Sequence, residues 1–130
     1  MSIFPTKILL ATDRSRDAQL AATTAADLAK STNSELHIVH VGEAPTFRAQ
    51  KALNTGVDML RETGATGIQA HLRFGRPDTL IIDLAEELGA GLIVMGSRGL
   101  GGVRRALMGS ISDSVVRHAP CPVLVVRQEE

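Results

Sequence analysis

The stretch Leu92-Ile93-Val94-Met95-Gly96 decides the fold, because four consecutive apolar residues lead directly into a glycine. A strand buried on both faces of a parallel sheet has no solvent side, so its sequence is a continuous apolar run rather than an alternating one. The stretch Ile8-Leu9-Leu10-Ala11 has the same character. Two such runs in one short chain predict an α/β fold, in which helices cover both faces of a parallel sheet.

Five strands are predicted in all, over residues 7–12, 35–41, 68–74, 91–96 and 122–126. The third alternates strictly between apolar and polar residues, as edge strands do. Right-handed crossovers then favour an open five-stranded parallel sheet in the order 3-2-1-4-5, which is a Rossmann-like architecture. The winding direction reverses between the first and fourth strands, so a ligand is expected just beyond their carboxyl ends.

Segments with a helical period separate these strands. The first has Asp17 in its opening turn, where a negative charge suits the helix dipole. One face of that segment consists of small residues: Ala18, Ala21, Ala22, Ala25 and Ala29. Another helix is expected to begin at Pro77 and to end at Gly89, since proline suits the first helical position and glycine the residue after the last. Residues 45–64 show a weaker helical period that contains Gly56.

The composition is that of a single domain over residues 1–130 and excludes several function classes. The chain has 14 Lys+Arg and 14 Asp+Glu, so its formal charge is zero and no overall field attracts nucleic acid. It contains three Phe and neither Trp nor Tyr, which leaves too few rings for a base-stacking groove. No DNA or RNA partner is therefore expected, and any anion site must be local.

The cysteine and the apolar segments predict a cytoplasmic protein. Cys121 is the only cysteine and is expected to pack as a small apolar side chain rather than form an internal disulfide. The apolar run at residues 8–11 is too short for a signal-peptide core, and nowhere do about 18 apolar residues follow one another. No membrane insertion is expected.

The four histidines are not predicted to form a metal site or to supply a catalytic base. They stand at His37, His40, His71 and His118, and neither they nor Cys121 show the spacing of zinc ligands. Surface or hydrogen-bonded positions are expected for them.

A glycine-rich stretch, residues 96–109, follows the fourth strand and predicts a phosphate site. Glycines let backbone N–H groups approach a ligand, and a helix that begins near Gly109 adds unpaired amides and a positive dipole end. The hydroxyls of Ser110 and Ser112 could donate to phosphate oxygens, and Arg98 could supply positive charge. Across the crevice, the first strand ends in Ala11-Thr12-Asp13.

Two interpretations of Asp13 stand side by side. Its carboxylate could accept hydrogen bonds from ribose hydroxyls or hold a hydrated magnesium ion. It could equally be a helix cap, a place for which Ser15 is as good a candidate.

Two familiar nucleotide loops are excluded by inspection. A Walker-type loop needs Gly-Lys where this chain has Gly101-Gly102, and the dinucleotide fingerprint needs glycine or alanine where it has Arg104. The chain instead contains the pattern Gly-x2-Gly-x9-Gly-Ser, at Gly96, Gly99, Gly109 and Ser110.

This four-point pattern resembles that of the universal stress protein family, in its ATP-binding branch. The resemblance extends to the stretches 8–13, 40–41, 93–99 and 120–126, and so covers nearly the whole chain. It implies that adenine and ribose lie near Ala11, Thr12, Asp13 and Val41. It also implies that the phosphates meet Gly96, Arg98, Gly99, Gly109, Ser110 and Ser112, with Ile111 contributing its backbone. The chain differs from many members in a short segment over residues 42–64, and from some in Ala11, where they carry proline.

The last predicted strand, from Pro122 to Val126, is an apolar edge, and exposed apolar edges favour pairing with another chain. A homodimer through this strand is expected, and the resemblance implies the same arrangement. The function expected is that of a regulatory protein in the stress response that binds ATP, or AMP or ADP. One alternative is a slow magnesium-dependent ATPase or a protein that phosphorylates its own Ser110 or Ser112. Another is a nucleotide-free scaffold that acts through its dimer surface.

Overall fold

A computed structural model describes residues 2–13, 17–97 and 109–127 of the chain. Strands and helices alternate along it. They are β1 (Lys7–Ala11), α1 (Ala18–Thr32), β2 (Glu35–Gly42), α2 (Phe47–Glu62), β3 (Gln69–Phe74), α3 (Pro77–Leu88), β4 (Leu92–Gly96), α4 (Ser110–His118) and β5 (Val123–Val126). Each predicted strand is present to within one residue at either end, and the helix predicted with the weakest period, α2, is also present.

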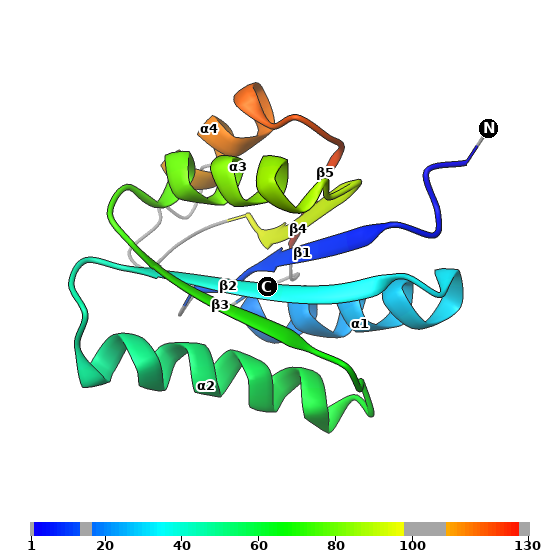
Figure 1. Ribbon diagram of the computed structural model, residues 1–130, viewed down its shortest axis with the longest axis horizontal. Helices are drawn as coiled ribbons and strands as arrows, with labels where there is room; N and C mark the ends of the chain where they lie inside the picture. The colour runs from blue at the N-terminus through cyan, green and yellow to red at the C-terminus, as the bar shows by residue number, and fades with distance from the viewer. Residues whose placement is uncertain (1, 14–16, 98–108, 128–130) are drawn as a thin grey trace.

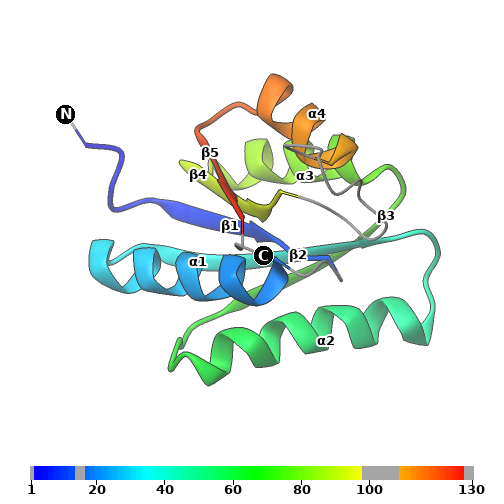
Figure 2. The same cartoon turned by 180° about the vertical axis from the view of Figure 1, so that it is seen from behind.

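The five strands form one parallel sheet in the order β3-β2-β1-β4-β5, which confirms the predicted topology (Figure 1). Helices α1 and α2 cover one face of the sheet, and α3 and α4 cover the other (Figure 2). The two cores lie between these layers. Ile8 and Leu10 point into the first core and Leu9 into the second, because successive side chains of a strand alternate between faces.

The helix ends follow from single residues. Pro77 stands in the first turn of α3, and Gly89 ends that helix in the left-handed conformation that glycine adopts without strain, as predicted. The N-cap of α1 is Asp17, so the interpretation of Asp13 as a helix cap is wrong. Ser15, the other predicted cap, lies outside the described residues. The alanine face of α1 is buried, also as predicted.

Gly56 lets α2 lie directly on the sheet. A Cβ atom at this buried position would stand 2.7 Å from Cδ1 of Ile38 and 3.2 Å from Cγ2 of Thr12. Because Thr12 follows the end of β1, the close approach at Gly56 fixes α2 beneath the edge where the ligand crevice is expected.

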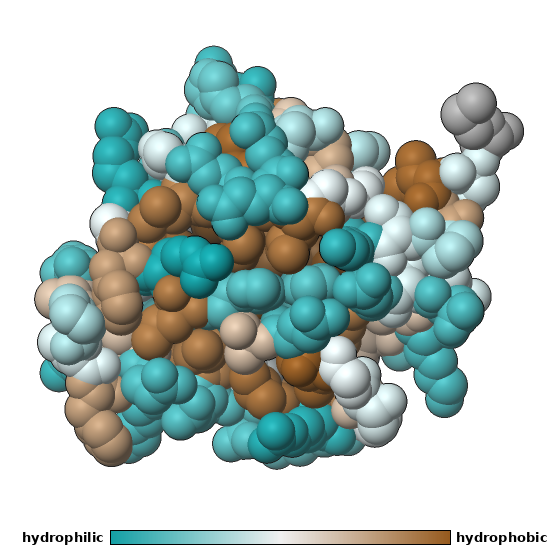
Figure 3. Space-filling view, viewed as in Figure 1, coloured by the Kyte–Doolittle hydropathy of each residue, from teal (hydrophilic) through white to brown (hydrophobic). Residues whose placement is uncertain are grey.

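The sheet has two open edges, at β3 and at β5. Along β3, apolar side chains show between the hydrophilic surfaces of α2 and α3 (Figure 3). At the other edge, Leu124 is 37% exposed while Val126 is buried. Among the residues described here, no helix is both long and apolar enough to span a bilayer.

Candidate functional site at the carboxyl ends of β1 and β4

The carboxyl ends of β1 and β4 lie side by side, with Ala11 opposite Met95. Beyond them the exposure rises along the chain: Ala11 is buried, Thr12 is partly buried, and Asp13 is exposed. The Thr12 N–H donates to the Val39 carbonyl at 3.0 Å, which holds the end of β1 against β2. The reversal of winding therefore falls where predicted, and Asp13 stands at its rim.

Helix α4 begins at this edge, and within the described residues no side chain caps its first turn. Its N-cap is Gly109, which offers no side chain to accept from the helix, and the first intrahelical bond runs from the Asp113 N–H to the Gly109 carbonyl at 2.9 Å. The amides of Ser110, Ile111 and Ser112 precede that bond. Amides in this position lack helical acceptors and, together with the dipole, favour an anion.

The two serines of this turn have different surroundings. The Ser112 side chain is buried, and its Oγ lies 2.9 Å from the Ser97 carbonyl oxygen and 3.1 Å from that of Gly109. Ser110 is exposed. The Ser110 hydroxyl is thus accessible as it stands, whereas the Ser112 hydroxyl would have to leave Ser97 to reach a phosphate.

Ser97 and Asp17 join the two halves of the site, and sequence reasoning did not find this contact. The Ser97 hydroxyl donates to Oδ2 of Asp17 at 2.9 Å, and both residues are fully buried. Asp17 was assigned only to the helix dipole. The signal that could have revealed it is an acidic residue just before a helix face that consists of buried alanines, since a carboxylate there needs a polar partner.

Two neighbouring cavities open beside β1 and β2 along α2, one reaching from Phe47 to Met59 and the other from Thr46 to Ala52. One, of about 620 Å³, has Thr12 and Asp13 in its wall, and the other, of about 510 Å³, has His40 and Val41. Arg48 of α2 lines both cavities. Of the residues predicted for adenine and ribose, Thr12 and Asp13 thus line one cavity and Val41 lines its neighbour. Arg48 and Lys51 add cations that the sequence analysis did not identify.

Three further predicted site residues are placed as follows. Gly96 is the last residue of β4 and is partly buried. Arg98 and Gly99 lie outside the described residues, so their positions remain predictions.

Asp13 is the carboxylate predicted to hold magnesium, and it lines the first cavity. In residues 2–13, 17–97 and 109–127, no group of three or more His, Cys, Asp or Glu could hold a metal ion. Asp13 by itself fits a hydrated ion whose other ligands are water and phosphate oxygens, which is how Mg²⁺ usually binds beside nucleotides.

The histidines are hydrogen-bonded, as expected. Nδ1 of His40 lies 3.4 Å from the Thr12 carbonyl oxygen, and Nδ1 of His118 lies 2.9 Å from that of Ser114. His37 and His71 contact each other on β2 and β3. Burial, assisted by the neighbouring His37, lowers the pKa of His71 below its ordinary value.

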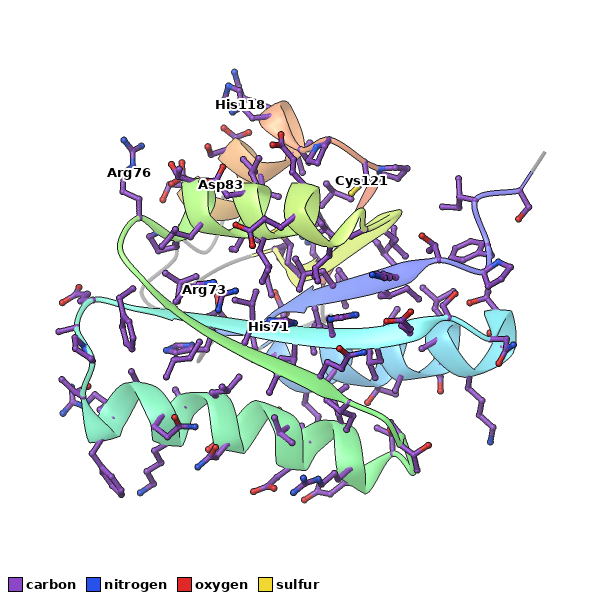
Figure 4. All side chains as sticks on the ribbon, viewed as in Figure 1. His71, Arg73, Arg76, Asp83, His118 and Cys121 are labelled. Atoms are coloured by element: carbon purple, nitrogen blue, oxygen red, sulfur yellow. The ribbon has the colours of Figure 1, made fainter. Side chains whose placement is uncertain are left out.

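Cys121 is partly buried, and burial raises the pKa of its thiol. The thiol therefore stays protonated at neutral pH, which is the form of a packing residue rather than of a nucleophile. Cys121 and His118 lie on the side of the sheet that α3 and α4 cover, whereas His71 lies on β3 (Figure 4).

The fold and the crevice define the class of protein: an open, doubly wound α/β domain whose candidate ligand site lies at the topological switch point. Comparison with protein families then gives the particular family. The model of the universal stress protein family matches residues 5–127, and the chain belongs to that family.

Similar sequences and similar solved structures come from the same family. A Staphylococcus haemolyticus protein, assigned by name to the universal stress proteins, is 37% identical over 140 residues, with 95% of this chain and 85% of the relative covered. The universal stress protein UspA of Lactobacillus plantarum has a TM-score of 0.83 at 27% identity, with 97% of this chain and 100% of that one covered.

Two of the similar structures contain an adenine nucleotide. A universal stress protein in complex with cAMP has a TM-score of 0.82 at 28% identity, with 98% of this chain and 100% of that one covered. The Archaeoglobus fulgidus universal stress protein in complex with dAMP has a TM-score of 0.75 at 26% identity, with 95% and 98% covered.

Proposed function

We propose that this protein binds ATP, or AMP or ADP, at the switch point as a regulatory ligand. The observation that carries the proposal is the first turn of α4: three amides without helical acceptors, capped by Gly109 and held to Ser97 at the end of β4. Ser97 directly follows β4, whose carboxyl end lies beside that of β1, and Asp13 beyond β1 is exposed. Similar proteins in complex with cAMP and dAMP support an adenine nucleotide as the ligand class.

In this proposal one side of the crevice binds the adenine and ribose, and the other side binds the phosphates. Adenine and ribose lie near Ala11, Thr12, Asp13 and Val41, where Asp13 accepts from ribose hydroxyls or from water bound to Mg²⁺. The phosphates meet Gly109 and the amides of Ser110 and Ile111, with Gly96, Arg98, Gly99 and Ser112 completing their surroundings. Amides at a helix start match phosphate without any charged side chain.

The nucleotide acts in this proposal as a signal rather than as a substrate. The amide and hydroxyl donors at the start of α4 bind phosphate but do not activate an attacking water, and the carboxylate of the same turn, Asp113, lies 3.0 Å from Nε of Arg117. The regulated state is a cytoplasmic homodimer that pairs through β5 and serves in the stress response. Leu124, exposed on that edge strand, supports the dimer.

The test is to denature the purified protein and to identify the released small molecule by mass spectrometry. An adenine nucleotide is expected, and its absorbance near 260 nm should dominate the spectrum because the chain has neither Trp nor Tyr. Absence of a released nucleotide, together with no heat on titration with ATP, ADP or AMP, would contradict the proposal. Phosphate release that scales with protein and disappears in Asp13→Ala would instead establish the ATPase alternative.

A further inference from the structure

Ser97 is a fully buried residue at which four elements of the fold meet. It follows β4 directly, and three hydrogen-bonding groups of this one residue reach three other elements. The hydroxyl donates to Asp17 at the start of α1, at 2.9 Å. The N–H donates to the carbonyl of Val126, the last residue of β5, at 3.0 Å. The carbonyl accepts from the start of α4.

The bonds to α4 come from its cap and its first turn. The Gly109 N–H and the Ser112 hydroxyl both donate to the Ser97 carbonyl oxygen, the latter at 2.9 Å. The same peptide region therefore holds the first turn of α4 on one side and the end of β5 on the other. A shift of Gly109 moves the Ser97 carbonyl, because the two are hydrogen-bonded. The N–H of Ser97 is in turn bonded to Val126 at the end of β5, so the shift reaches that strand.

Burial makes this arrangement stiff. Ser97, Asp17, Ser112 and Val126 are each less than a tenth exposed. Water cannot replace a bond that is broken there, so the bonds persist or shift together rather than one at a time. A displacement at α4 is thereby passed to β5 instead of being absorbed by solvent.

We propose that Ser97 is a positioning residue that couples nucleotide binding at the first turn of α4 to pairing of β5 with a second copy of the chain. The inference rests on the proposed nucleotide site and on the proposed β5 dimer. Phosphate bound to the amides of Ser110 and Ile111 anchors α4, which fixes Ser97 and orders the end of β5. The nucleotide then favours the dimer, and by linkage the dimer binds the nucleotide more tightly by the same factor.

The test measures this factor. The dimer dissociation constant is determined by sedimentation equilibrium with and without ATP, and ATP affinity is measured separately by calorimetry. In the wild type, ATP should tighten the dimer at least about fivefold, within the usual range of coupling between sites. Ser97→Ala keeps the backbone bonds to α4 and β5 but removes the hydroxyl that anchors the residue to Asp17, so the backbone of residue 97 can turn without moving β5. The ratio should therefore fall towards one while ATP still binds.

Two variants serve as matched controls. Asp17→Asn keeps an oxygen that accepts from the Ser97 hydroxyl, so it should retain the ratio. Ser114→Ala removes another hydroxyl of α4, one that bonds to Asp78 of α3 rather than to Ser97. This variant should also retain the ratio of the dimer dissociation constants with and without ATP. A loss of stability alone changes both dissociation constants but not the ratio between them.

The outcomes separate the inference from the function on which it rests. A wild type that binds ATP without any change in its dimer constant, or a Ser97→Ala variant that keeps the full ratio, overturns the coupling and leaves nucleotide binding intact. Absence of ATP binding overturns both. If Ser97→Ala does not fold, amide exchange in the wild type decides: ATP should slow exchange at Ser97 and Gly109 together, and slowing at Gly109 alone refutes the coupling.

Discussion

Nδ1 of His37 lies 3.0 Å from Nε2 of His71, and the two rings stack with their centroids 5.2 Å apart. Only one proton can occupy that contact, because two protonated rings would present two donors and two positive charges to each other. On its other side, Nε2 of His37 lies 3.2 Å from Oε1 of Glu35. The side chains of Glu35, His37 and His71 thus link the edge strand β3 to β2, and their protonation makes the stability of the fold depend on pH.

We predict that the protein loses stability as the pH falls below about 6.5. Burial, His37 and Arg73 lower the pKa of His71 below its ordinary value of 6.5, while Glu87 opposes them. The unfolded chain therefore takes up the proton first. Stability is complete above 6.5 and declines as the pH falls from 6.5 towards the lower pKa of the folded state. Urea unfolding midpoints at pH 8.0 and 5.5 measure the effect.

His71→Gln provides the control, because a glutamine amide can still donate to His37 but does not titrate. The pH dependence between 8.0 and 5.5 should be smaller in this variant than in the wild type. Equal slopes for the two proteins would show that His71 is not the group responsible. The lowered pKa of Glu35, caused chiefly by its hydrogen bond to His37, acts only below its ordinary value of 4.5, outside this range.

Gly56→Ala should destabilise the protein although it places a better helix former in α2. The gain in helix propensity is about 1 kcal/mol, but the added Cβ would stand 2.7 Å from Cδ1 of fully buried Ile38. Overpacking of this kind costs about 1–3 kcal/mol, so the net loss should be about 1 kcal/mol. ATP affinity should fall as well, because Thr12 is the other neighbour of that Cβ.

Asn54→Ala is the matched control for Gly56→Ala, since Asn54 is an exposed residue of the same helix. It should leave the urea midpoint unchanged or raise it slightly. A Gly56→Ala protein as stable as this control would mean that α2 can move away from the sheet at no cost.

Ser114→Ala should loosen α4 from α3. The Ser114 hydroxyl donates to Oδ2 of Asp78 at 2.7 Å and is the chief cause of the lowered pKa of that carboxyl. Its loss should cost about 1 kcal/mol of unfolding free energy and raise the pKa of Asp78 towards its ordinary value. Carbon-detected NMR titration of the Asp78 carboxyl reads the second effect directly, and an unchanged titration would show that the bond does not persist in solution.

Val125→Pro should convert the dimer into a monomer. The carbonyls of Pro122 and Val126 accept from β4, so alternation along the parallel ladder turns the N–H and C=O of Val125 towards the open edge. Proline removes that N–H without removing a bond to β4. Sedimentation velocity at micromolar concentration should show a dimer for wild type and for Val125→Thr, and a monomer for Val125→Pro. A dimer in all three would place the interface elsewhere.

The strands and their order could be predicted because continuous and alternating apolar runs report directly on burial. The continuous apolar runs that start at Ile8 and Leu92 form central strands, and the alternating residues 69–74 form an edge strand, because each pattern reflects how many faces of the strand are buried. The helix ends at Pro77 and Gly89 were predictable too, since each depends on the backbone of one residue.

The contacts between distant side chains could not be predicted in this way. Ser97 and Asp17 are 80 residues apart, and a serine beside glycines gives no sign that it will be buried and bonded. The inward turn of Ser112 has the same origin, because the pattern places a hydroxyl in the first turn of α4 but does not say whether it faces the ligand or the Ser97 carbonyl. Gly56 was read as a weakness in a helix, whereas its role is a close approach to the sheet.

The most direct test of the central claim is the ATP affinity of Ser110→Pro. Gly109 has φ −73° and ψ 167°, a conformation that accepts a following proline, and proline is tolerated in the first turn of a helix. The substitution therefore removes one amide and one hydroxyl from the proposed phosphate site without breaking α4, whereas Ser110→Ala removes the hydroxyl alone.

Calorimetry should show about tenfold weaker ATP binding for Ser110→Ala and a further loss of about tenfold or more for Ser110→Pro, with melting temperatures close to that of the wild type. These factors correspond to about 1.5–3 kcal/mol for each hydrogen bond to a charged phosphate. Equal ATP affinity in all three proteins would contradict the account, because the phosphates would then not lie at the start of α4.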